Sequence, residues 1–264
     1  MTADRGKSRM PAVFIGHGSP MNALEDNRYT AAWASFAASI PPPTAIVCVS
    51  AHWFINASAV TAMTAPRTIH DFFGFPQALF DMRYPAPGSP ELAERIVGAA
   101  APMWIGLDYD SWGLDHGTWS VLARMYPSAD IPVVQLSLDA SKPQQHHFDL
   151  GVGLDALRSD GVLIVCSGNI VHNLGLVQPA LAEAGFDWAE RFDTRVREIM
   201  TTGTSDDLLA LSRDRDYPLA VPTPDHYLPL LYLGGIAEAA GTRATVVIDG
   251  YAYGSLSMTS LVVA

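Results

Sequence analysis

Three of the eight histidines occupy one kind of position, at or shortly after the end of an apolar run that is typical of a buried strand. They are His17 in VFIGHG, His52 in IVCVSAHW and His172 in LIVCSGNIVH. Ligands of open α/β sheets bind at the carboxyl ends of the strands, so we expect these imidazoles to lie near one edge of a sheet. Neutral imidazole is the commonest metal ligand in proteins, and three histidines around a divalent ion leave positions open for water, substrate or dioxygen. The pattern therefore predicts a metal-dependent catalytic centre.

Two further histidines stand where helices are expected to begin. His226 lies in PTPDHYLPLLY, where Pro224 or Asp225 can start a helix, so its ring belongs to a first turn and can face the sheet edge. His116 lies in LDHGTW, between a turn and a helix. Taken alone, each histidine is explained more simply as a hydrogen-bonded structural residue, and only their shared position favours a site.

The remaining histidines give weaker signals. His146 and His147 are adjacent on an expected helix, so their side chains diverge and we interpret both as surface residues. His70 lies in a long loop, where it could contact a substrate or be exposed to solvent. Signatures of common hydrolases, zincin proteases and NTPases, namely G-x-S-x-G, H-E-x-x-H and the P-loop, do not occur.

The elements that must position these residues alternate along the chain. Continuous apolar runs predict strands at Ala12–Gly16, Thr44–Ser50, Ile131–Leu136, Val162–Ser167 and Thr245–Ile248, with Ser255–Val263 as an added edge strand. Amphipathic segments predict helices at Tyr29–Ser39, Pro90–Ala101, Thr118–Met125, Gln144–Arg158, Trp188–Met200 and His226–Ala239. This alternation predicts a single catalytic α/β domain over residues 11–264, with a central, mostly parallel mixed sheet covered by helices on both faces. Residues 1–10 are expected to form a flexible tail.

The segment Thr64–Gly88 has no clear periodicity and is rich in proline, glycine and aromatic residues. A loop of this length inside a compact domain is usually functional, so we expect a lid or binding loop.

The composition limits the partners. With 49% hydrophobic residues, 16% charged residues and a net charge of −11, the chain has material for a large core but no excess of basic residues. We therefore expect no nucleic-acid and no membrane partner. Cys48 and Cys166 lie in strand-like runs and are expected to be buried thiols in a reducing compartment. Ala12–Ile15 is too short for a signal sequence, and the predicted location is the cytoplasm.

Several motifs, taken in order, resemble one enzyme family. GHGSPMNALE, SAHW, HDFFGFP with YPAPGSPELA, DYDSWGLDHGTW, SGNIVHNL and DHYLPLLY follow one another much as in class III extradiol ring-cleavage dioxygenases of the DOPA 4,5-dioxygenase type. The resemblance runs from about Pro11 to Ser257. The wider superfamily includes protocatechuate 4,5-dioxygenase and a non-enzymatic branch, so membership alone does not define the activity.

The resemblance implies a divalent metal held by His17, His52 and His226, and an acid/base histidine at His172 or His116. His172 is also a candidate fourth ligand. In the protocatechuate enzymes the third ligand resembles a glutamate, whereas here His226 takes the matching place and leaves the centre one charge more positive. The implied cofactor is Fe(II) for ring cleavage or Zn(II) in the isolated protein. The implied partners are a small, DOPA-like aromatic diol and O2, and the chain is expected to be a monomer or a homodimer.

A histidine with an ordinary pKa of about 6.5 suits the removal of a catechol proton and its later return. Trp53, Phe72, Phe75 and Tyr227 adjoin the motifs and could line a ring pocket, although each is equally well explained as core. Two alternatives stay open. One is a zinc-dependent hydrolase in which the same histidines lower the pKa of a bound water, and the other is a non-catalytic binding protein of the same fold.

Overall fold

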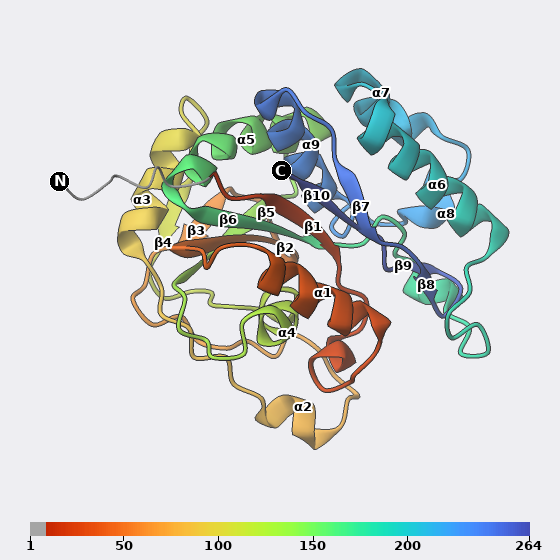
Figure 1. Ribbon diagram of the computed structural model, residues 1–264, viewed down its shortest axis with the longest axis horizontal. Helices are drawn as coiled ribbons and strands as arrows, with labels where there is room; N and C mark the ends of the chain where they lie inside the picture. The colour runs from red at the N-terminus through yellow and green to blue at the C-terminus, as the bar shows by residue number, and fades with distance from the viewer. Residues whose placement is uncertain (1–8) are drawn as a thin grey trace.

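The computed structural model describes residues 9–264 as a large mixed sheet with helices against both faces (Figure 1). In spatial order the strands run β4-β3-β5-β2-β6-β1-β10-β7. Their bounds are β1 (Ala12–Gly16), β2 (Ala45–Ile55), β3 (Ala59–Thr61), β4 (Gly106–Asp108), β5 (Val133–Asp139), β6 (Val162–Gly168), β7 (Thr245–Ile248) and β10 (Ser260–Val263). The central strands β5, β2, β6 and β1 are parallel, whereas β3 and β10 pair antiparallel with the core and β7 pairs antiparallel with β10. The predicted mostly parallel, mixed sheet is confirmed.

Helices fill the connections between the strands. The α-helices are α1 (Arg28–Ser39), α2 (Gln77–Asp81), α3 (Pro90–Ala99), α4 (His116–Met125), α5 (Gln144–Leu154), α6 (Asp187–Thr202), α7 (Ser205–Ala210), α8 (Tyr217–Ala220) and α9 (Leu228–Ala240). Short 3-10 turns are η1 (Pro20–Ala23), η2 (Asp155–Asp160), η3 (Leu174–Leu176) and η4 (Leu211–Arg213). Figure 1 shows α1 and α4 below the sheet and α5 and α9 above it. A small hairpin of β8 (Tyr251–Ala252) and β9 (Leu256–Ser257) lies beside the sheet.

The core consists of two apolar clusters, one on each face of the sheet. Along β1, Ala12 and Phe14 belong to the cluster under α5 and α9, whereas Val13 and Ile15 belong to the cluster over α1 and α4. Successive side chains of a strand point to opposite faces, so a strand that is covered on both faces must be apolar throughout. This explains why the strand runs in the sequence are continuous rather than alternating.

Two of the expected strands take a different course in the structure. The segment Ser255–Val263 divides into β9 and β10, and β10 lies between β1 and β7 rather than at the edge, which β7 occupies. The second strand was expected to end at Ser50, but β2 continues to Ile55. Its pairing with β5 is irregular between Val49 and Phe54, so the polar break in the apolar run marks a bulge and not the end of the strand.

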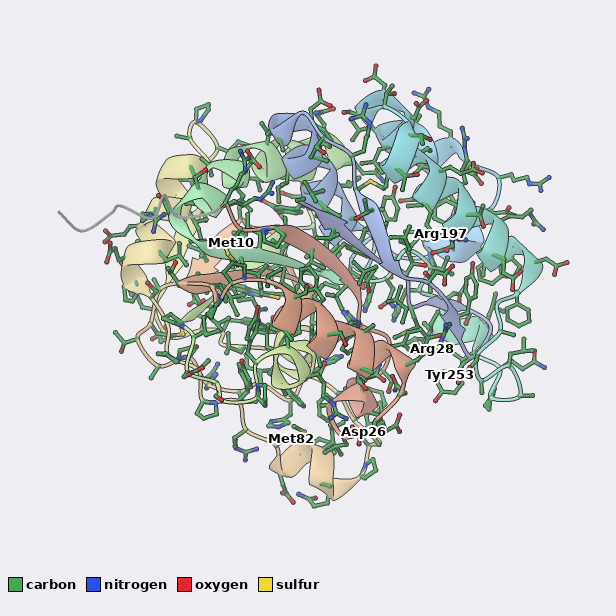
Figure 2. The ribbon with its side chains drawn as sticks, in the orientation of Figure 1. Met10, Asp26, Arg28, Met82, Arg197 and Tyr253 are labelled. Carbon is green, nitrogen blue, oxygen red and sulfur yellow. The ribbon has the colours of Figure 1, made fainter. Side chains whose placement is uncertain are left out.

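The expected flexible tail covers residues 1–10, of which residues 1–8 lie outside the described part of the chain. Met10, labelled in Figure 2, is buried, and its backbone N–H donates to the carbonyl of Arg158 at 2.9 Å. Cys48 and Cys166 are buried free thiols, as expected. Within residues 9–264, no helix is both long and apolar enough to cross a membrane.

Candidate metal centre

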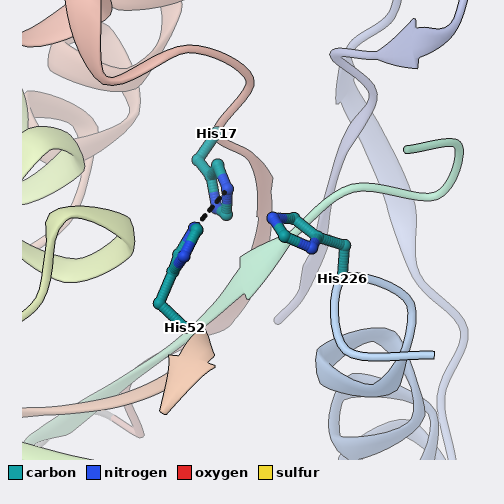
Figure 3. Close-up of side chains that lie close together, drawn as sticks. All are labelled: His17, His52 and His226. Carbon is teal, nitrogen blue, oxygen red and sulfur yellow. Dashed lines mark hydrogen bonds between the residues drawn. The ribbon is translucent and has the colours of Figure 1, made fainter. Parts of the chain in front are cut away.

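The rings of His17, His52 and His226 face a common space at the carboxyl ends of the central strands (Figure 3). His17 follows β1 directly, His52 lies at the bulge of β2, and His226 lies in the turn before α9. The ring centroids are 5.1 Å apart for His17 and His52, 5.2 Å for His17 and His226, and 4.9 Å for His52 and His226. One ring nitrogen from each residue lies within 4.8 Å of the others, which is a spacing that one ion can bridge.

A hydrogen bond to β6 fixes the orientation of His17. Its Nδ1 lies 2.9 Å from the hydroxyl oxygen of Ser167, and this hydroxyl donates its own proton to the carbonyl of Gly117 at 2.6 Å. Because the hydroxyl proton is engaged in this way, the oxygen of Ser167 accepts a hydrogen bond from the N–H that His17 carries on Nδ1. The lone pair of His17 is therefore on Nε2, which lies 3.3 Å from Nε2 of His52.

Carboxylates orient the other two rings in the same sense. Nδ1 of His52 lies 3.2 Å from Oδ2 of Asp71, and Nδ1 of His226 bonds to the carboxylate of Asp225. Each carboxylate accepts a hydrogen bond from Nδ1–H and leaves Nε2 unprotonated, which is the arrangement found around metal-ligating histidines. Nε2 of His226 is buried and has no hydrogen-bond partner in the described chain.

The donor set fits a divalent metal ion. Three unprotonated Nε2 atoms that face one buried space repel each other unless a cation lies between them. A second cluster, His52 with Asp71 and His116, also has its ligand atoms within 4.8 Å of one another. In that cluster, however, Oδ1 of Asp71 accepts the backbone N–H of His116 at 3.0 Å and Oδ2 faces His52, so the carboxylate already has partners. The three Nε2 atoms form the better site.

Two glycines allow the backbone segments of the site to approach closely. A Cβ atom on Gly168, at the end of β6, would lie 2.2 Å from the carbonyl oxygen of His226. A Cβ atom on Gly117 would lie 2.8 Å from Cδ2 of His52. Real Cβ atoms do not approach other atoms this closely, so larger residues at either position would displace a histidine of the centre.

A pocket of about 530 Å³ opens onto the centre. Its size is in the usual range for small-molecule sites. His172 and His116 both line it, beside His52 and His226. The ring of His172 is stacked on that of His226, and the ring of His116 lies 3.7 Å from that of His52, centroid to centroid. The remaining lining residues, which are mostly apolar, are Gly18, Ser19, Pro20, Met21, Asp71, Phe72, Phe73, Phe75, Leu174, Val177, Tyr253 and Leu256.

Most histidines of the site favour the neutral form. Burial, followed by the neighbouring histidines, lowers the pKa of His17 and of His226 well below the ordinary value. Burial also lowers the pKa of His172 to about 4 and is the largest cause of the lowered pKa of His116. Neutral imidazoles are the form that binds a metal ion or accepts a proton.

Carboxylates reverse this trend at His52. Burial disfavours its charge, but Asp71 and Asp115 outweigh burial and raise the pKa of His52 above its ordinary value. Burial also opposes ionisation of Asp71, yet its close contacts with His116 and His52 hold the pKa of that carboxyl far below the usual range. Asp71 is therefore an anion that lies between a candidate ligand and a candidate base.

The aromatic residues that adjoin the motifs divide into two groups. Phe72 and Phe75 line the pocket. Trp53 instead stacks on Trp112, with ring centroids 5.7 Å apart, and Tyr227 is buried in the core. The long loop therefore contributes side chains to the pocket, as expected for a binding loop.

The surface interpretation of His147 is wrong. Its side chain is 0% exposed, and Nδ1 lies 3.2 Å from the hydroxyl of Tyr232, because α5 packs along α9 with this side of the helix inward. His146 is half-buried rather than on the surface. His70 does not line the pocket; its Nε2 lies 3.0 Å from the carbonyl oxygen of Met82 in the same loop.

The partners of the ring Nδ1 atoms were not expected from the sequence. Asp71 and Asp225 adjoin histidines in HDFF and PDHY, and Ser167 lies near the end of a strand run. A carboxylate next to a candidate ligand histidine is a usable signal for Asp225. No such signal exists for Asp71, because its partner His52 is distant in sequence.

Comparisons with known proteins identify the family of this chain. Residues 11–264 match the family model described as the catalytic LigB subunit of aromatic ring-opening dioxygenase. The chain is 50% identical over 257 residues to a 4,5-DOPA dioxygenase extradiol of Escherichia coli, covering 96% of this chain and 94% of that protein. It is 36% identical over 259 residues to a protein of the same name from Beta vulgaris, covering 94% of this chain and 96% of that protein.

A solved structure extends the likeness to the fold. The crystal structure of an uncharacterized protein from Escherichia coli K12 superimposes with a TM-score of 0.84 at 45% identity, covering 97% of this chain and all of that one. The family match spans nearly the whole chain. The two named relatives align over nearly their whole length with this chain, and both are named for the same activity. The chain therefore belongs to the LigB family and is an extradiol aromatic ring-opening dioxygenase.

Proposed function

We propose that this enzyme opens the ring of a catechol with dioxygen at an Fe(II) ion held by His17, His52 and His226. The observation that carries the proposal is the convergence of three Nε2 atoms, each freed by a partner on Nδ1, beside a mostly apolar pocket that His52 and His226 line. An Fe(II) ion in this position would supply the redox chemistry that the activation of dioxygen requires.

The overall reaction balances without another redox partner. In extradiol cleavage, the carbon–carbon bond beside the diol breaks and both atoms of O2 enter the product. The catechol is the electron donor and O2 is the oxidant. The protein must therefore bind the diol, exclude water and move protons.

His172 is the proposed base for the catechol hydroxyl. It lines the pocket, and burial lowers its pKa to about 4, so the ring is neutral at pH 7 and a nitrogen lone pair is open to a catechol proton. Its contact with the ring of His226 holds it beside the metal site. After ring opening, His172 would return the proton to the product.

His116, which also lines the pocket, is proposed to assist. Its Nδ1 lies 2.9 Å from Oδ1 of Asp71, so the carboxylate would stabilise the imidazolium if His116 accepted a proton. The rings of Phe72 and His116 lie edge to face, with centroids 5.4 Å apart. Phe72 and Phe75 would keep bulk water away from the diol.

Oxygen isotope labelling tests the proposal. Protein prepared without oxygen is loaded with Fe(II), mixed with 4-methylcatechol and exposed to ¹⁸O2. We expect one O2 consumed per catechol, two labelled atoms in a yellow product, and no oxygen uptake by the zinc-loaded protein, because zinc has no redox chemistry. Turnover by the zinc form without oxygen uptake would favour the hydrolase instead.

A further inference from the structure

A buried carboxylate outside the candidate site lies on the inward face of α6. Asp193 is 0% exposed, and the other buried residues of this helix are apolar: Ala189, Phe192, Val196, Ile199 and Met200. Burial raises the pKa of Asp193, although its hydroxyl partners and Arg197 act in the opposite direction. A buried carboxylate is costly unless hydrogen bonds and an opposite charge compensate it. The partners of Asp193 therefore show what this carboxylate holds in place.

Asp193 binds three hydroxyl groups from the C-terminal part of the chain. Its Oδ1 accepts the hydroxyl of Ser257 at 2.5 Å, and its Oδ2 accepts those of Thr259 at 3.1 Å and Tyr251 at 3.2 Å. Nε of Arg197, one turn further along α6, lies 2.9 Å from Oδ2 and supplies the positive charge. Tyr251 and Ser257 belong to β8 and β9, and Thr259 immediately precedes β10. The carboxylate thus ties the β8–β9 hairpin and the start of β10 to α6.

β9 pairs in turn with the segment that carries His172. His172 and Leu256 form an antiparallel bridge. The N–H of Ser257 donates to the carbonyl of Val171 at 2.9 Å, and the side-chain amide of Asn169 donates to the carbonyl of Ser257 at 2.7 Å. Ser257 therefore joins the carboxylate of α6 to the residues that precede His172.

Further bonds hold the residue that follows His172. The N–H of Asn173 donates to the carbonyl of Ser255 at 3.1 Å, and the hydroxyl of Ser255 donates to the carbonyl of Asn173 at 2.7 Å. The N–H of His172 itself donates to the carbonyl of Ala220 at 2.9 Å. The backbone on both sides of His172 is thus fixed by the strand that Asp193 holds.

The ring of His172 lacks the partner that orients the other histidines of the site. Nδ1 of each ligand histidine, and of His116, faces an oxygen of a serine or an aspartate. Within the described chain, no other side chain forms a hydrogen bond to the ring of His172, which stacks on His226 instead. The position of this ring therefore depends on its backbone, and a misplacement of about 1 Å can cost about 10²-fold in rate.

We propose that Asp193 is a positioning residue for His172. The carboxylate holds β9 through Ser257, and β9 fixes the backbone that brings His172 to the pocket beside the ligand histidines. Asp193 itself does not line the pocket, so it acts only through the residues that it binds. The inference rests on the proposed function, since it takes His172 as the base for the catechol hydroxyl.

Hydrogen exchange of the zinc-loaded protein, followed by mass spectrometry, tests the inference without turnover. In Asp193→Asn, an amide with one acceptor oxygen replaces the carboxylate, so hydroxyl partners are lost. We expect the backbone amides of residues 169–173 to exchange at least about tenfold faster than in the wild type, because β9 opens more easily. Ser257→Ala removes one hydroxyl and should have the same effect to a smaller degree; it decides the test if Asp193→Asn does not fold. Wild-type exchange of this segment would overturn the inference.

Asp155→Asn is the matched control. Asp155 is also buried and also binds an arginine, with Oδ1 at 2.9 Å from Arg158. It lies in η2, which leads into the amino end of β6, whereas His172 follows the carboxyl end of that strand. This variant should lower the stability against urea but leave the exchange of residues 169–173 unchanged. Equal acceleration in Asp155→Asn and Asp193→Asn would overturn the inference, because any lost buried carboxylate would then have the same effect.

A double-variant cycle on the iron-loaded enzyme connects Asp193 to His172. Asp193→Asn should lower kcat by roughly tenfold to 10²-fold without loss of metal. In the His172→Gln background it should lower kcat by less than about twofold, because the side chain that it positions is already gone. An equal loss in both backgrounds would overturn the inference. Absence of oxygen uptake by the wild type, or a wild-type kcat in His172→Gln, would instead overturn the proposed function, and the exchange rates then decide the inference alone.

Discussion

The imidazole of His172 lies parallel to that of His226, with ring centroids 3.4 Å apart and planes inclined by 3°. The stacking places His172 beside His226, one of the three proposed metal ligands, and His172 is not among the residues whose ring nitrogens converge within 4.8 Å of one another. This relationship favours proton transfer over metal binding as the role of His172.

Replacement of His172 by glutamine tests that role. His172→Gln should keep the metal and bind catechol, but kcat should fall by roughly 10²–10⁴, the usual contribution of a general base. Loss of metal would instead make His172 a ligand. His116→Gln is measured beside it, and near-normal turnover in both variants would mean that the substrate or the metal centre carries the proton.

Asp71→Asn should weaken metal binding by about 10- to 100-fold, the usual effect of losing an outer partner of a ligand. The two carboxylate oxygens of Asp71 contact Nδ1 of His52 and the backbone N–H of His116, one each. An amide has only one acceptor oxygen, so the asparagine loses one of these two contacts. Competition with a chelating dye measures the affinity. Asp225→Asn should act similarly through His226, whereas Asp110→Asn, at an exposed site, should have no effect. Unchanged affinity in Asp71→Asn would show that His52 needs no carboxylate.

The long loop should act on the substrate and not on the metal. A short glycine–serine linker in place of residues 73–81 removes α2 and Phe75 but keeps Asp71 and Phe72. We expect KM for catechols to rise at least about tenfold while the metal content stays at the wild-type level, because Phe73 and Phe75 line the pocket and none of the removed residues belongs to the three-histidine cluster. Unchanged kinetics would indicate that this part of the loop is scaffold.

The strands and long helices could be predicted because burial on both faces leaves a direct record in the sequence. β1 and β7 match their apolar runs residue for residue, and α1 differs by one residue at its start. β3 and β4 were not predicted, since three-residue strands have no detectable period. β10 was placed at an edge because sequence patterns carry no information on the strand that pairs beyond it.

The candidate site could be predicted from the sequence only where its residues lie next to an apolar run. The positions of His17 and His52 near the ends of apolar runs were enough to place them at one sheet edge. The contact of Asp71 with His52 could not be predicted, because it depends on the path of an irregular loop. His147 was misplaced because two adjacent helical residues were both assigned to the outside, whereas α9 covers one of them.

His147 should make the protein less stable in acid. Burial is the main cause that lowers its pKa to about 4, so between pH 6.5 and 4 the unfolded chain binds more protons at this residue than the folded chain. Stability therefore rises with pH in this window, is complete above 6.5 and is lost toward 4. In His147→Gln, the slope of unfolding free energy against pH should fall by up to about 1.4 kcal/mol per pH unit.

Urea denaturation of the metal-free protein between about pH 4 and pH 7 measures that slope. His146→Gln is the matched control, since His146 is the neighbouring residue but is only half-buried, and its effect on the slope should be smaller. An unchanged slope in His147→Gln would mean that His147 is solvated in the folded state.

Anaerobic titration of the metal-free protein with Fe(II) tests the central claim most directly. The wild-type chain should bind one ion, and His17→Ala, His52→Ala and His226→Ala should each lose most of it, because two remaining protein ligands hold an ion weakly. His147→Gln, away from the centre, should bind like wild type. One tightly bound ion in any two of the three alanine variants would contradict the assignment of these histidines as the metal ligands.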